Sequence, residues 1–293
     1  MLIGIANPKT VGRISGLGWG FGYIGGILAL VLVVVFYVFD WFGLPDDAGL
    51  PFRIIAVACA LWAIVFSIPI FLNVPEPSLG RPERKVGFFA SYGLLVKDVV
   101  GLYRNPDTRQ TFWFLLSSAV FRDGLGGVFA FGAVIASQVF DFGFLDLVIF
   151  GIAANLIAGV STIIAGRYDD RFGPKRIILV SLAAMVVAGL AVFFLVDAGT
   201  VVFWIGGLVL CAFVGPAQAA SRSFLARITP AGREGEIFGL YATTGRAASW
   251  MASGAWTLLI VLSGSTSYGI LGIVLVLIAG FLLLLPVKAT QRG

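Results

Sequence analysis

Long apolar stretches recur along most of this sequence and constrain its fold more than any other feature. A helix needs roughly 20 apolar residues to cross the hydrocarbon core of a bilayer, which is about 30 Å thick. Every backbone polar group inside that core must be hydrogen-bonded within the protein, which favours helices. Stretches of suitable length cover residues 17–39, 54–73, 111–136, 145–165, 177–196, 201–220, 237–262 and 268–287. The sequence therefore predicts an all-α, polytopic membrane protein with about eight transmembrane helices.

The composition indicates the same class of protein. Of the 293 residues, 59% are hydrophobic and only 12% are charged, whereas an ordinary soluble domain carries roughly 25% charged residues. A chain so poor in charge cannot cover its own surface in water, so lipid must cover it. The lipid bilayer is therefore the first expected partner.

The histidine and cysteine content of the sequence excludes several classes of functional site. It contains no histidine, which excludes histidine-based zinc sites and histidine-dependent catalytic triads. Its two cysteines, Cys59 and Cys211, lie in apolar stretches, so no disulfide framework is expected. No metal and no cofactor is predicted. The net charge of +5 comes from short basic segments between apolar blocks, so nucleic acid is not an expected partner.

The basic residues fall in alternate loops, which predicts the orientation of the chain in the membrane. Loops rich in lysine and arginine stay in the cytoplasm. The loops of the opposite set are acidic, and Arg53 is their only basic residue. This alternation predicts a multi-pass protein of the cell membrane (the inner membrane of a bacterium) with both termini cytoplasmic. The predicted cytoplasmic segments contain Lys9, Arg13, Arg81, Arg84, Lys85, Lys97, Arg104, Arg109, Arg167, Arg171, Lys175, Arg176, Arg227, Arg233, Lys288 and Arg292.

One long loop divides the predicted spans into two groups. Residues 1–75 hold two transmembrane helices, residues 76–110 form a cytoplasmic connector, and residues 111–293 form a six-helix half. The connector begins with prolines and continues with an amphipathic stretch over residues 86–103. That stretch either lies along the membrane interface or serves as a solvated connector, and its pattern is typical of both.

The most specific string, GRYDDRFGPKR, runs from Gly166 to Arg176 between the fourth and fifth predicted spans. Gly166 and Gly173 permit a tight reversal of the chain, and Asp170 is a residue type that caps helix N-termini. Three cations would hold the turn at the level of the lipid headgroups: Arg171, Lys175 and Arg176. An ordinary positive-inside turn would explain these charges but not their spacing.

This spacing resembles the cytoplasmic signature loop of the major facilitator superfamily, where it lies between the second and third helices and recurs between the eighth and ninth. Strings over residues 11–26, 215–223 and 232–241 are similar to a bacterial branch related to the fungal autophagy-linked vacuolar amino-acid effluxers. The resemblance covers nearly the whole chain and implies that its spans correspond to helices five to twelve of the family fold. About the first four helices would then be lacking. We expect a truncated or split gene product, or one with a misassigned start, whose N-terminal half is encoded upstream. The alternative is a natural eight-span protein.

The resemblance implies a secondary active transporter that moves a small solute across the membrane by alternating access. Efflux of amino acids or similar small polar molecules is the expected activity, with protons as a candidate coupling ion. The alternative is a non-transporting remnant, or a subunit of a split transporter, that needs the missing N-terminal helices. A membrane-embedded enzyme would need paired carboxylates, a histidine cluster or an activated nucleophile, and the single mid-membrane carboxylate does not meet that need. No enzymatic activity is predicted.

Three ionisable residues lie deep inside predicted spans and are candidates for handling solute or protons: Arg122, Asp123 and Arg246. Such groups cost about 2.5–3.5 kcal/mol each at the bilayer centre, so they face a cavity or a partner. Adjacent helical residues point about 100° apart, so Arg122 and Asp123 are poorly placed to neutralise each other. Asp123 is expected either to handle solute or a proton, or to form an ion pair with Arg246 or Arg122. Such a pair would leave one arginine free to bind a carboxylate of the solute. The alternative for Arg246 is that its side chain reaches back to the cytoplasmic face.

Two polar residues follow a helix break that is expected at Gly215 and Pro216, where proline removes a backbone donor. Gln218 and Arg222 are predicted to form a gate or a solute contact at the cytoplasmic end of that span. For Arg222, contact with lipid headgroups is the favoured role.

The first span contains a regular series of glycines. Gly18, Gly22 and Gly26 recur every four residues, which places them on one side of a helix. Small residues at this spacing let two helix backbones approach closely. The series therefore predicts a helix-packing face.

Overall fold

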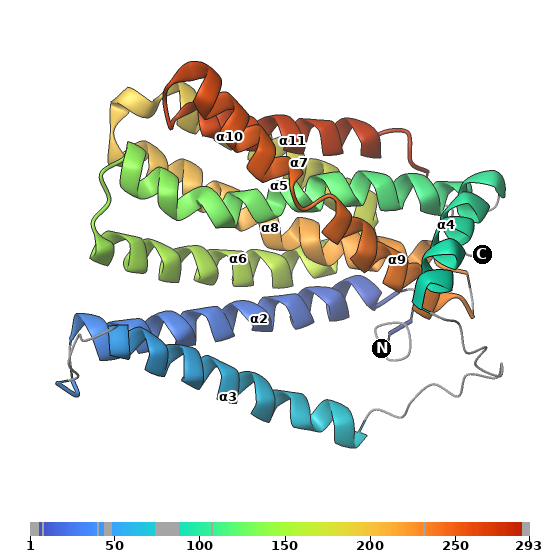
Figure 1. The fold of residues 1–293 in the computed structure, drawn as a ribbon, viewed down its shortest axis with the longest axis horizontal. Helices are drawn as coiled ribbons and strands as arrows, with labels where there is room; N and C mark the ends of the chain where they lie inside the picture. Colours follow the sequence, from blue (N-terminus) through green and yellow to red (C-terminus); the bar gives the residue numbers. More distant parts are fainter. Residues whose placement is uncertain are drawn as a thin grey trace.

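The computed structural model consists of helices joined by short connections, and Figure 1 shows most of them running along the long axis of the molecule. The structure describes residues 6–7, 9–39, 41–43, 49–73, 88–106, 108–230 and 232–288, and these residues include no strand. A π-helical turn, η1 (Val34–Val38), continues α2, and a 3₁₀ turn, η3 (Val196–Ala198), precedes α8. The α-helices are α2 (Val11–Val33), α3 (Leu50–Asn73), α4 (Phe88–Arg104), α5 (Arg109–Val139), α6 (Phe144–Phe172), α7 (Pro174–Phe194), α8 (Thr200–Ile228), α9 (Glu234–Ala247), α10 (Met251–Ser263) and α11 (Tyr268–Leu284).

Six helical segments are long and apolar enough to cross a membrane: α2 with η1, α3, α5, α6, α7 and α8. Helix α11 is also apolar but has only 17 residues. Many large apolar side chains are exposed, among them Phe71, Val261 and Leu262, as expected where lipid covers the protein. The prediction of an all-α, polytopic membrane protein is confirmed.

The seventh predicted span, residues 237–262, is wrong as a continuous helix. It is divided between α9, with 14 residues, and α10, with 13 residues, and the chain breaks over residues 248–250. Neither helix alone is long enough to cross about 30 Å of hydrocarbon. Because apolar residues continue on both sides of the break, hydropathy does not reveal it. What stabilises the break is a side chain from another helix, described below.

The core lies among the helices that follow α4, and α2 and α3 lie along one side of them (Figure 1). Helix α2 packs against α6 and α8, whereas α3 packs mainly against α2 and η1. The fully buried side chains of Phe121, Phe224 and Leu277 come from α5, α8 and α11. Helix α11 approaches α5 closely because Gly280 lies against Phe121, where an added Cβ would be 2.5 Å from the phenylalanine Cβ. Such backbone contacts make this part of the bundle a rigid frame.

Helices α2 and α6 cross at short range through three glycines spaced one turn apart: Gly12, Gly16 and Gly20. A Cβ at Gly16 would lie 2.8 Å from the carbonyl oxygen of Thr162, and one at Gly20 would lie 2.7 Å from the side chain of Ile163. Larger residues at these positions would force the two helices apart. This glycine stripe therefore sets the distance between α2 and the rest of the bundle.

Of the three glycines of the predicted packing face, only Gly26 packs against another helix within the described residues, and the packing role of Gly18 and Gly22 stays a prediction. A Cβ built at Gly18 or Gly22 meets no atom within 4 Å in the described chain, whereas one at Gly26 would meet the side chain of Asn155. From Gly16 to Gly22 every second residue is glycine. Residues two apart on a helix point about 200° apart, so two glycine stripes lie on opposite sides of α2. The spacing predicts a stripe but cannot select between the two.

The connections agree with the predicted turns where the structure describes them. Gly173 takes a left-handed φ of +87° between α6 and α7, and Pro174 begins α7. The predicted amphipathic stretch forms α4, which packs against α5, and its place relative to the membrane stays a prediction. Outside the described residues lie Met1, the connector prolines, Arg81, Arg84, Lys85 and Arg292.

The glycine stripe of α2 can be tested with a matched pair of substitutions. Gly16→Ala places a methyl group against a backbone carbonyl that cannot move freely, so we expect overpacking to cost about 1–3 kcal/mol. Gly18→Ala adds the same methyl group on the same helix in open space. The thermal unfolding midpoint of the purified protein should fall for Gly16→Ala and stay within a degree or so for Gly18→Ala. Equal midpoints would show that α2 does not pack on α6 in this way.

Candidate functional site

The signature loop lies where α6 meets α7, and its residue Asp170 caps α2. The two carboxylate oxygens of Asp170 accept hydrogen bonds from the backbone amides of Gly12 (2.8 Å) and Arg13 (2.9 Å). The first amides of a helix have no partner within that helix and form the positive end of its dipole. The capping role predicted for Asp170 is therefore found on α2, where Gly12 lies 158 residues earlier in the sequence.

Arg227 of α8 binds both aspartates of the loop. Its Nη1 lies 2.9 Å from Oδ1 of Asp169, and its Nη2 lies 2.9 Å from Oδ1 of Asp170. Asp169 is buried and also accepts a hydrogen bond from the hydroxyl of Ser223. Buried charges are tolerated when they are paired and hydrogen-bonded. We call Asp169, Asp170, Ser223, Arg227 and the first turn of α2 the clamp.

Sequence reasoning did not single out Asp169 or Arg227 as site residues. The adjacent pair Asp169 and Asp170 is the sequence feature that indicates a polar site here. Two neighbouring carboxylates at the end of an apolar span need a cation nearby. The sequence offers many loop cations, and none of them is marked as the partner. Only the packing of α6 against α8 brings Arg227 to this pair.

The predicted cations of the signature loop have different surroundings. Lys175 donates hydrogen bonds to the backbone carbonyls of Leu285 (2.7 Å) and Val287 (2.6 Å), just after α11. A cation at a helix C-terminus satisfies carbonyls that have no partner in the helix, so Lys175 has this structural role. Its predicted place at the level of the headgroups stays a prediction. Arg171 and Arg176 are exposed, and their contact with headgroups stays a prediction.

Gly166 does not help to reverse the chain as predicted, because it lies inside α6. Its role is steric, since a Cβ at this position would lie 2.9 Å from the carbonyl oxygen of Gly12. The reversal depends on Gly173 alone. The signature string thus joins α6 to the start of α2, the end of α8 and the end of α11.

A second polar cluster lies mid-way along α5 and joins it to α8 and α9. Arg122 donates from Nη1 to the backbone carbonyl of Tyr241 (2.9 Å), and its guanidinium carbon lies 3.8 Å from the centre of the Tyr241 ring. The Tyr241 hydroxyl is hydrogen-bonded to the Ser221 hydroxyl at 2.8 Å. Arg222 lies 5.6 Å from the centre of the Trp19 ring, which extends the cluster to α2. Aromatic faces stabilise cations without neutralising them. We call these five residues the arginine cluster.

Asp123 has a different partner from the one predicted. Its Oδ2 accepts a 2.6 Å hydrogen bond from the backbone amide of Ala252, in the first turn of α10. The ion pairs of the described residues do not join Asp123 to Arg122 or Arg246, so the predicted pairing is wrong. The break before α10 leaves amides without a partner in their own helix, and a carboxylate satisfies such amides and the helix dipole. Asp123 therefore stabilises the break in the seventh predicted span.

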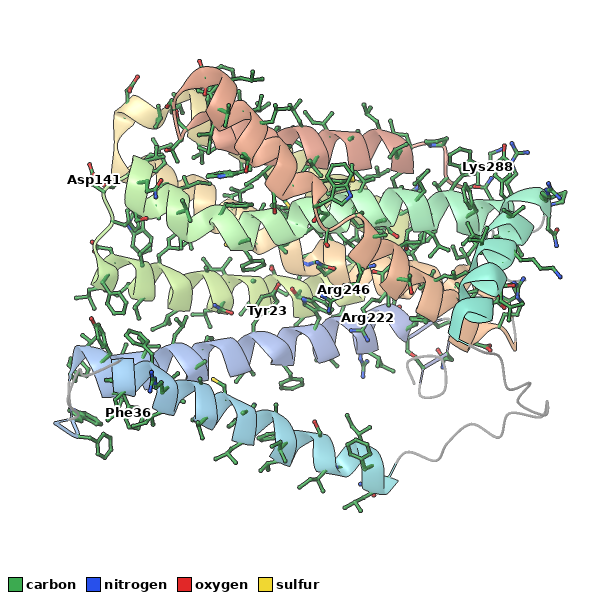
Figure 2. All side chains as sticks on the ribbon, in the orientation of Figure 1. Tyr23, Phe36, Asp141, Arg222, Arg246 and Lys288 are labelled. Atoms are coloured by element: carbon green, nitrogen blue, oxygen red, sulfur yellow. The ribbon has the colours of Figure 1, made fainter. Side chains whose placement is uncertain are left out.

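Arg246 lies at the end of α9, immediately before this break, and is exposed. Figure 2 shows Arg246 and Arg222 near the middle of the bundle's length. Gln218 is half-buried one turn before Arg222 on α8, so the two share a face of that helix. Among the described residues, no ion pair involves Arg122, Arg222 or Arg246. Their guanidinium groups can therefore donate to a carboxylate or phosphate.

Helix α8 does not break at Gly215 and Pro216 as predicted. It runs on to Ile228 with the proline inside it. A Cβ at Gly215 would collide with the hydroxyl of Thr162 and would lie 3.0 Å from that of Tyr23. Close packing against α6 and α2 thus holds this turn in place, and tertiary contact overrides the proline's effect.

Comparisons with known sequences identify relatives over nearly the whole chain. The family model described as "Vacuole effluxer Atg22 like" matches residues 6–293. The uncharacterized MFS-type transporter YxiO of Bacillus subtilis (strain 168) is 24% identical over 286 residues, which cover 97% of this chain and 65% of that protein. Autophagy-related protein 22 of Cryptococcus neoformans var. neoformans serotype D (strain B-3501A) is 25% identical over 306 residues, which cover 97% of this chain and 54% of that protein. The chain thus spans about half to two thirds of the length of these relatives.

A solved structure shows the same fold. The crystal structure of the human organic anion transporter MFSD10 (TETRAN) superimposes with a TM-score of 0.70 at 17% sequence identity. The match covers 97% of this chain and 66% of that chain. At this identity the likeness concerns the fold alone.

The clamp yields a stability prediction. Asp170→Ala removes the cap of α2 and one carboxylate partner of Arg227, and loss of a helix cap alone costs about 0.5–2 kcal/mol. We expect a clear fall in the thermal unfolding midpoint of the purified protein. Arg171→Ala, at the exposed neighbouring position, is the matched control and should leave the midpoint nearly unchanged. A fall of the same size in both variants would contradict the capping role.

Proposed function

The chain belongs to the family of vacuole effluxer Atg22-like proteins, and we propose that it acts in secondary active transport of a small solute by alternating access. The family match over residues 6–293 and the fold shared with a solved transporter support this proposal. The observation that carries it is the arginine cluster, since Arg122 lies mid-way along a spanning helix and, among the described residues, neither it nor Arg222 has a carboxylate partner. Cations at that depth are costly to keep unless they face a cavity or a ligand.

The solute is proposed to carry a carboxylate, as amino acids and similar small polar molecules do. Arg122 uses one of its five N–H donors on the Tyr241 carbonyl. Arg246 is exposed at the end of α9, and the same helix carries Tyr241. A guanidinium pairs with a carboxylate through two parallel hydrogen bonds. Arg122 and Arg246 are therefore our candidates for solute binding, with Arg222 and Gln218 as a gate or a further contact.

Asp123 is proposed to handle a proton or the amine of the solute. Its carboxylate holds the first turn of α10 through the Ala252 amide. Protonation would remove the negative charge that interacts with the helix dipole and would weaken this cap. Loading Asp123 would then change the angle between α9 and α10 at the break, which links binding to a conformational change.

The clamp is proposed to hold one end of the molecule closed. It joins α2 to α6 and α8, which lie on opposite sides of the long connector in the sequence. Alternating access requires the two groups of helices to separate at one end and then at the other. Opening the clamp end would break the contacts of Asp170 with both α2 and Arg227. We propose that residues 1–75 and 111–293 are the two moving parts and that residues 76–110 connect them.

A second candidate function is that of a subunit or non-transporting remnant that needs further helices. The chain covers 65% of the length of one relative and 54% of another. In the described chain, the second glycine stripe of α2, at Gly18 and Gly22, meets no other helix. A smooth, unpacked stripe on a membrane helix suits another helix supplied by a missing N-terminal half.

Solute flux tests the leading proposal. The protein is reconstituted in liposomes, and uptake of labelled amino acids is measured for the unaltered chain, Asp123→Asn and Arg246→Gln. Loss of a charged hydrogen-bonding group costs about 1.5–3 kcal/mol, so flux should fall roughly tenfold or more in both variants. Arg171→Gln is the control, because it removes an exposed cation from the signature loop.

The outcomes separate the two candidate functions. Unchanged flux in both variants would remove these residues from the transport site while leaving the fold intact. No flux from the unaltered chain, restored by coexpression of the helices that relatives carry in addition, would establish the subunit function. No flux in either case would contradict transport.

Orientation follows from the same proposal and has its own test. With both termini cytoplasmic, reporters fused to the C-terminus and inserted after Lys175 should lie in the cytoplasm. A reporter inserted after Asp141, between α5 and α6, should lie on the opposite side of the membrane. We expect phosphatase activity only for the Asp141 insertion. Activity from the Lys175 insertion would reverse the proposed orientation.

A further inference from the structure

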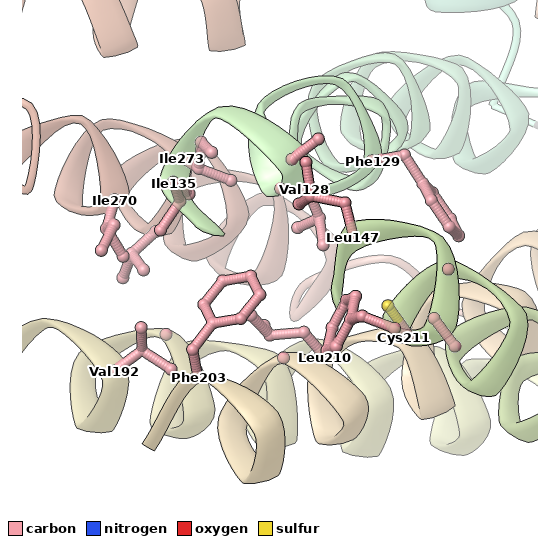
Figure 3. A pocket seen from close by; sticks show the side chains of 18 of the residues that line it. Val128, Phe129, Ile135, Leu147, Val192, Phe203, Leu210, Cys211, Ile270 and Ile273 are labelled. Carbon is pink, nitrogen blue, oxygen red and sulfur yellow. The ribbon is translucent and has the colours of Figure 1, made fainter. Parts of the chain in front are cut away.

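A cavity of about 170 Å³ lies among α5, α6, α7, α8 and α11, separate from the clamp and the arginine cluster. It is partly open, because its lining includes the exposed side chains of Phe129 and Ala133. Figure 3 shows side chains from several helices pointing into the same space, with Phe203 and Leu210 on one side and Val128 and Ile273 on the opposite side. The lining is almost entirely apolar. The transport mechanism proposed above does not use this cavity.

The cavity is unsuited to water. Its polar side chains are the Asn155 amide and the Cys211 thiol. The Asn155 Nδ2 donates to the carbonyl of Gly151 in its own helix at 2.8 Å. Its Oδ1 lies against Gly26 of α2, where an added Cβ would be 2.6 Å away. A buried water needs two to four polar partners. This lining therefore offers a water molecule fewer partners than it needs to be held in place.

The walls of the cavity cannot easily collapse into it. A Cβ at Gly189 would lie 2.6 Å from Val274, and one at Gly207 would lie 2.8 Å from Phe150. The helices around the cavity are thus already in close contact beside it. The rings of Phe150 and Phe203 also pack with their centres 5.0 Å apart. Well-packed surroundings relax little around a void, so the space persists.

We propose that this cavity is a binding site for a small, uncharged, single-ring aromatic molecule. An engineered dry cavity of about 150 Å³ in another protein binds benzene, and the cavity here is of similar size and lining. The apolar walls gain contact area and dispersion energy from such an occupant. They offer no partner for a charged group, which excludes ions and zwitterions. This inference is independent of solute transport.

Two glycines of α5 provide a matched pair of variants for the test. A Cβ added at Gly132 or at Gly126 meets no atom within 4 Å in the described chain, and only Gly132 lines the cavity. Gly132→Leu therefore fills the cavity, whereas Gly126→Leu adds the same side chain elsewhere on α5. Toluene is the ligand probe, and benzylammonium is its charged analogue.

The experiment measures thermal unfolding of the purified protein with and without a saturating concentration of toluene. Ligand that binds only the folded state should raise the midpoint by roughly 2–4 °C in the unaltered protein and in Gly126→Leu. Gly132→Leu should show no rise, and benzylammonium should have no effect on any variant. No rise in the unaltered protein, or an equal rise in Gly132→Leu, would overturn the proposal.

A second measurement locates the ligand if Gly132→Leu does not fold. In crystals of the unaltered protein soaked with bromobenzene, the bromine should give an anomalous signal among the side chains of Val128, Phe203 and Ile273, which line the cavity. A signal elsewhere, together with a raised midpoint in toluene, would place the ligand outside this cavity and would overturn the assignment.

Discussion

Backbone groups at helix ends have no partner within their helix, and inside a bilayer no water can supply one. This constraint explains the positions of three charged side chains in the bundle. Asp170 binds the first amides of α2, Asp123 binds an amide at the start of α10, and Lys175 binds the carbonyls that follow α11. In each case the sign of the charge opposes the helix dipole. A chain with few charged residues thus uses three of them to complete helices that begin or end inside the fold.

The sequence predicts the spanning helices well because hydropathy reports the same physical requirement that the membrane imposes. It fails at the break over residues 248–250, since an apolar run is equally apolar whether it forms one helix or two. At α2 the sequence cannot show which glycine stripe packs against α6, because glycines at two-residue spacing create two stripes on opposite faces. Choosing between them requires the position of α6, which no local pattern contains. The sequence also predicts a helix break at Pro216 that the structure lacks. Packing around Gly215 keeps α8 continuous, and no local pattern contains that packing.

The sequence predicts several residues of the candidate site, but it predicts only in part which groups those residues contact. Arg122, Asp123 and Arg246 stand out because ionisable groups are rare in spanning segments. The partners of Arg122 and Asp123 cannot be deduced from the sequence. They are the Tyr241 carbonyl and the Ala252 amide, which are backbone groups of a kind that nearly every residue possesses. The signature string indicated a turn with a capping aspartate. The identity of the capped helix and the role of Arg227 depend on the packing of α2, α6 and α8.

The long sequence separation within the clamp has a consequence for biogenesis. Helix α2 leaves the ribosome well before α6 and α8, so during insertion its first amides lack the carboxylate that later binds them. Until then its glycine stripe also has no helix to rest against. Before α6 and α8 are inserted, α2 is therefore held without the contacts of its first turn and of this stripe. The clamp is complete only when α6 has brought Asp170 to the first amides of α2 and α8 has brought Arg227 between the two aspartates, so it forms late in insertion.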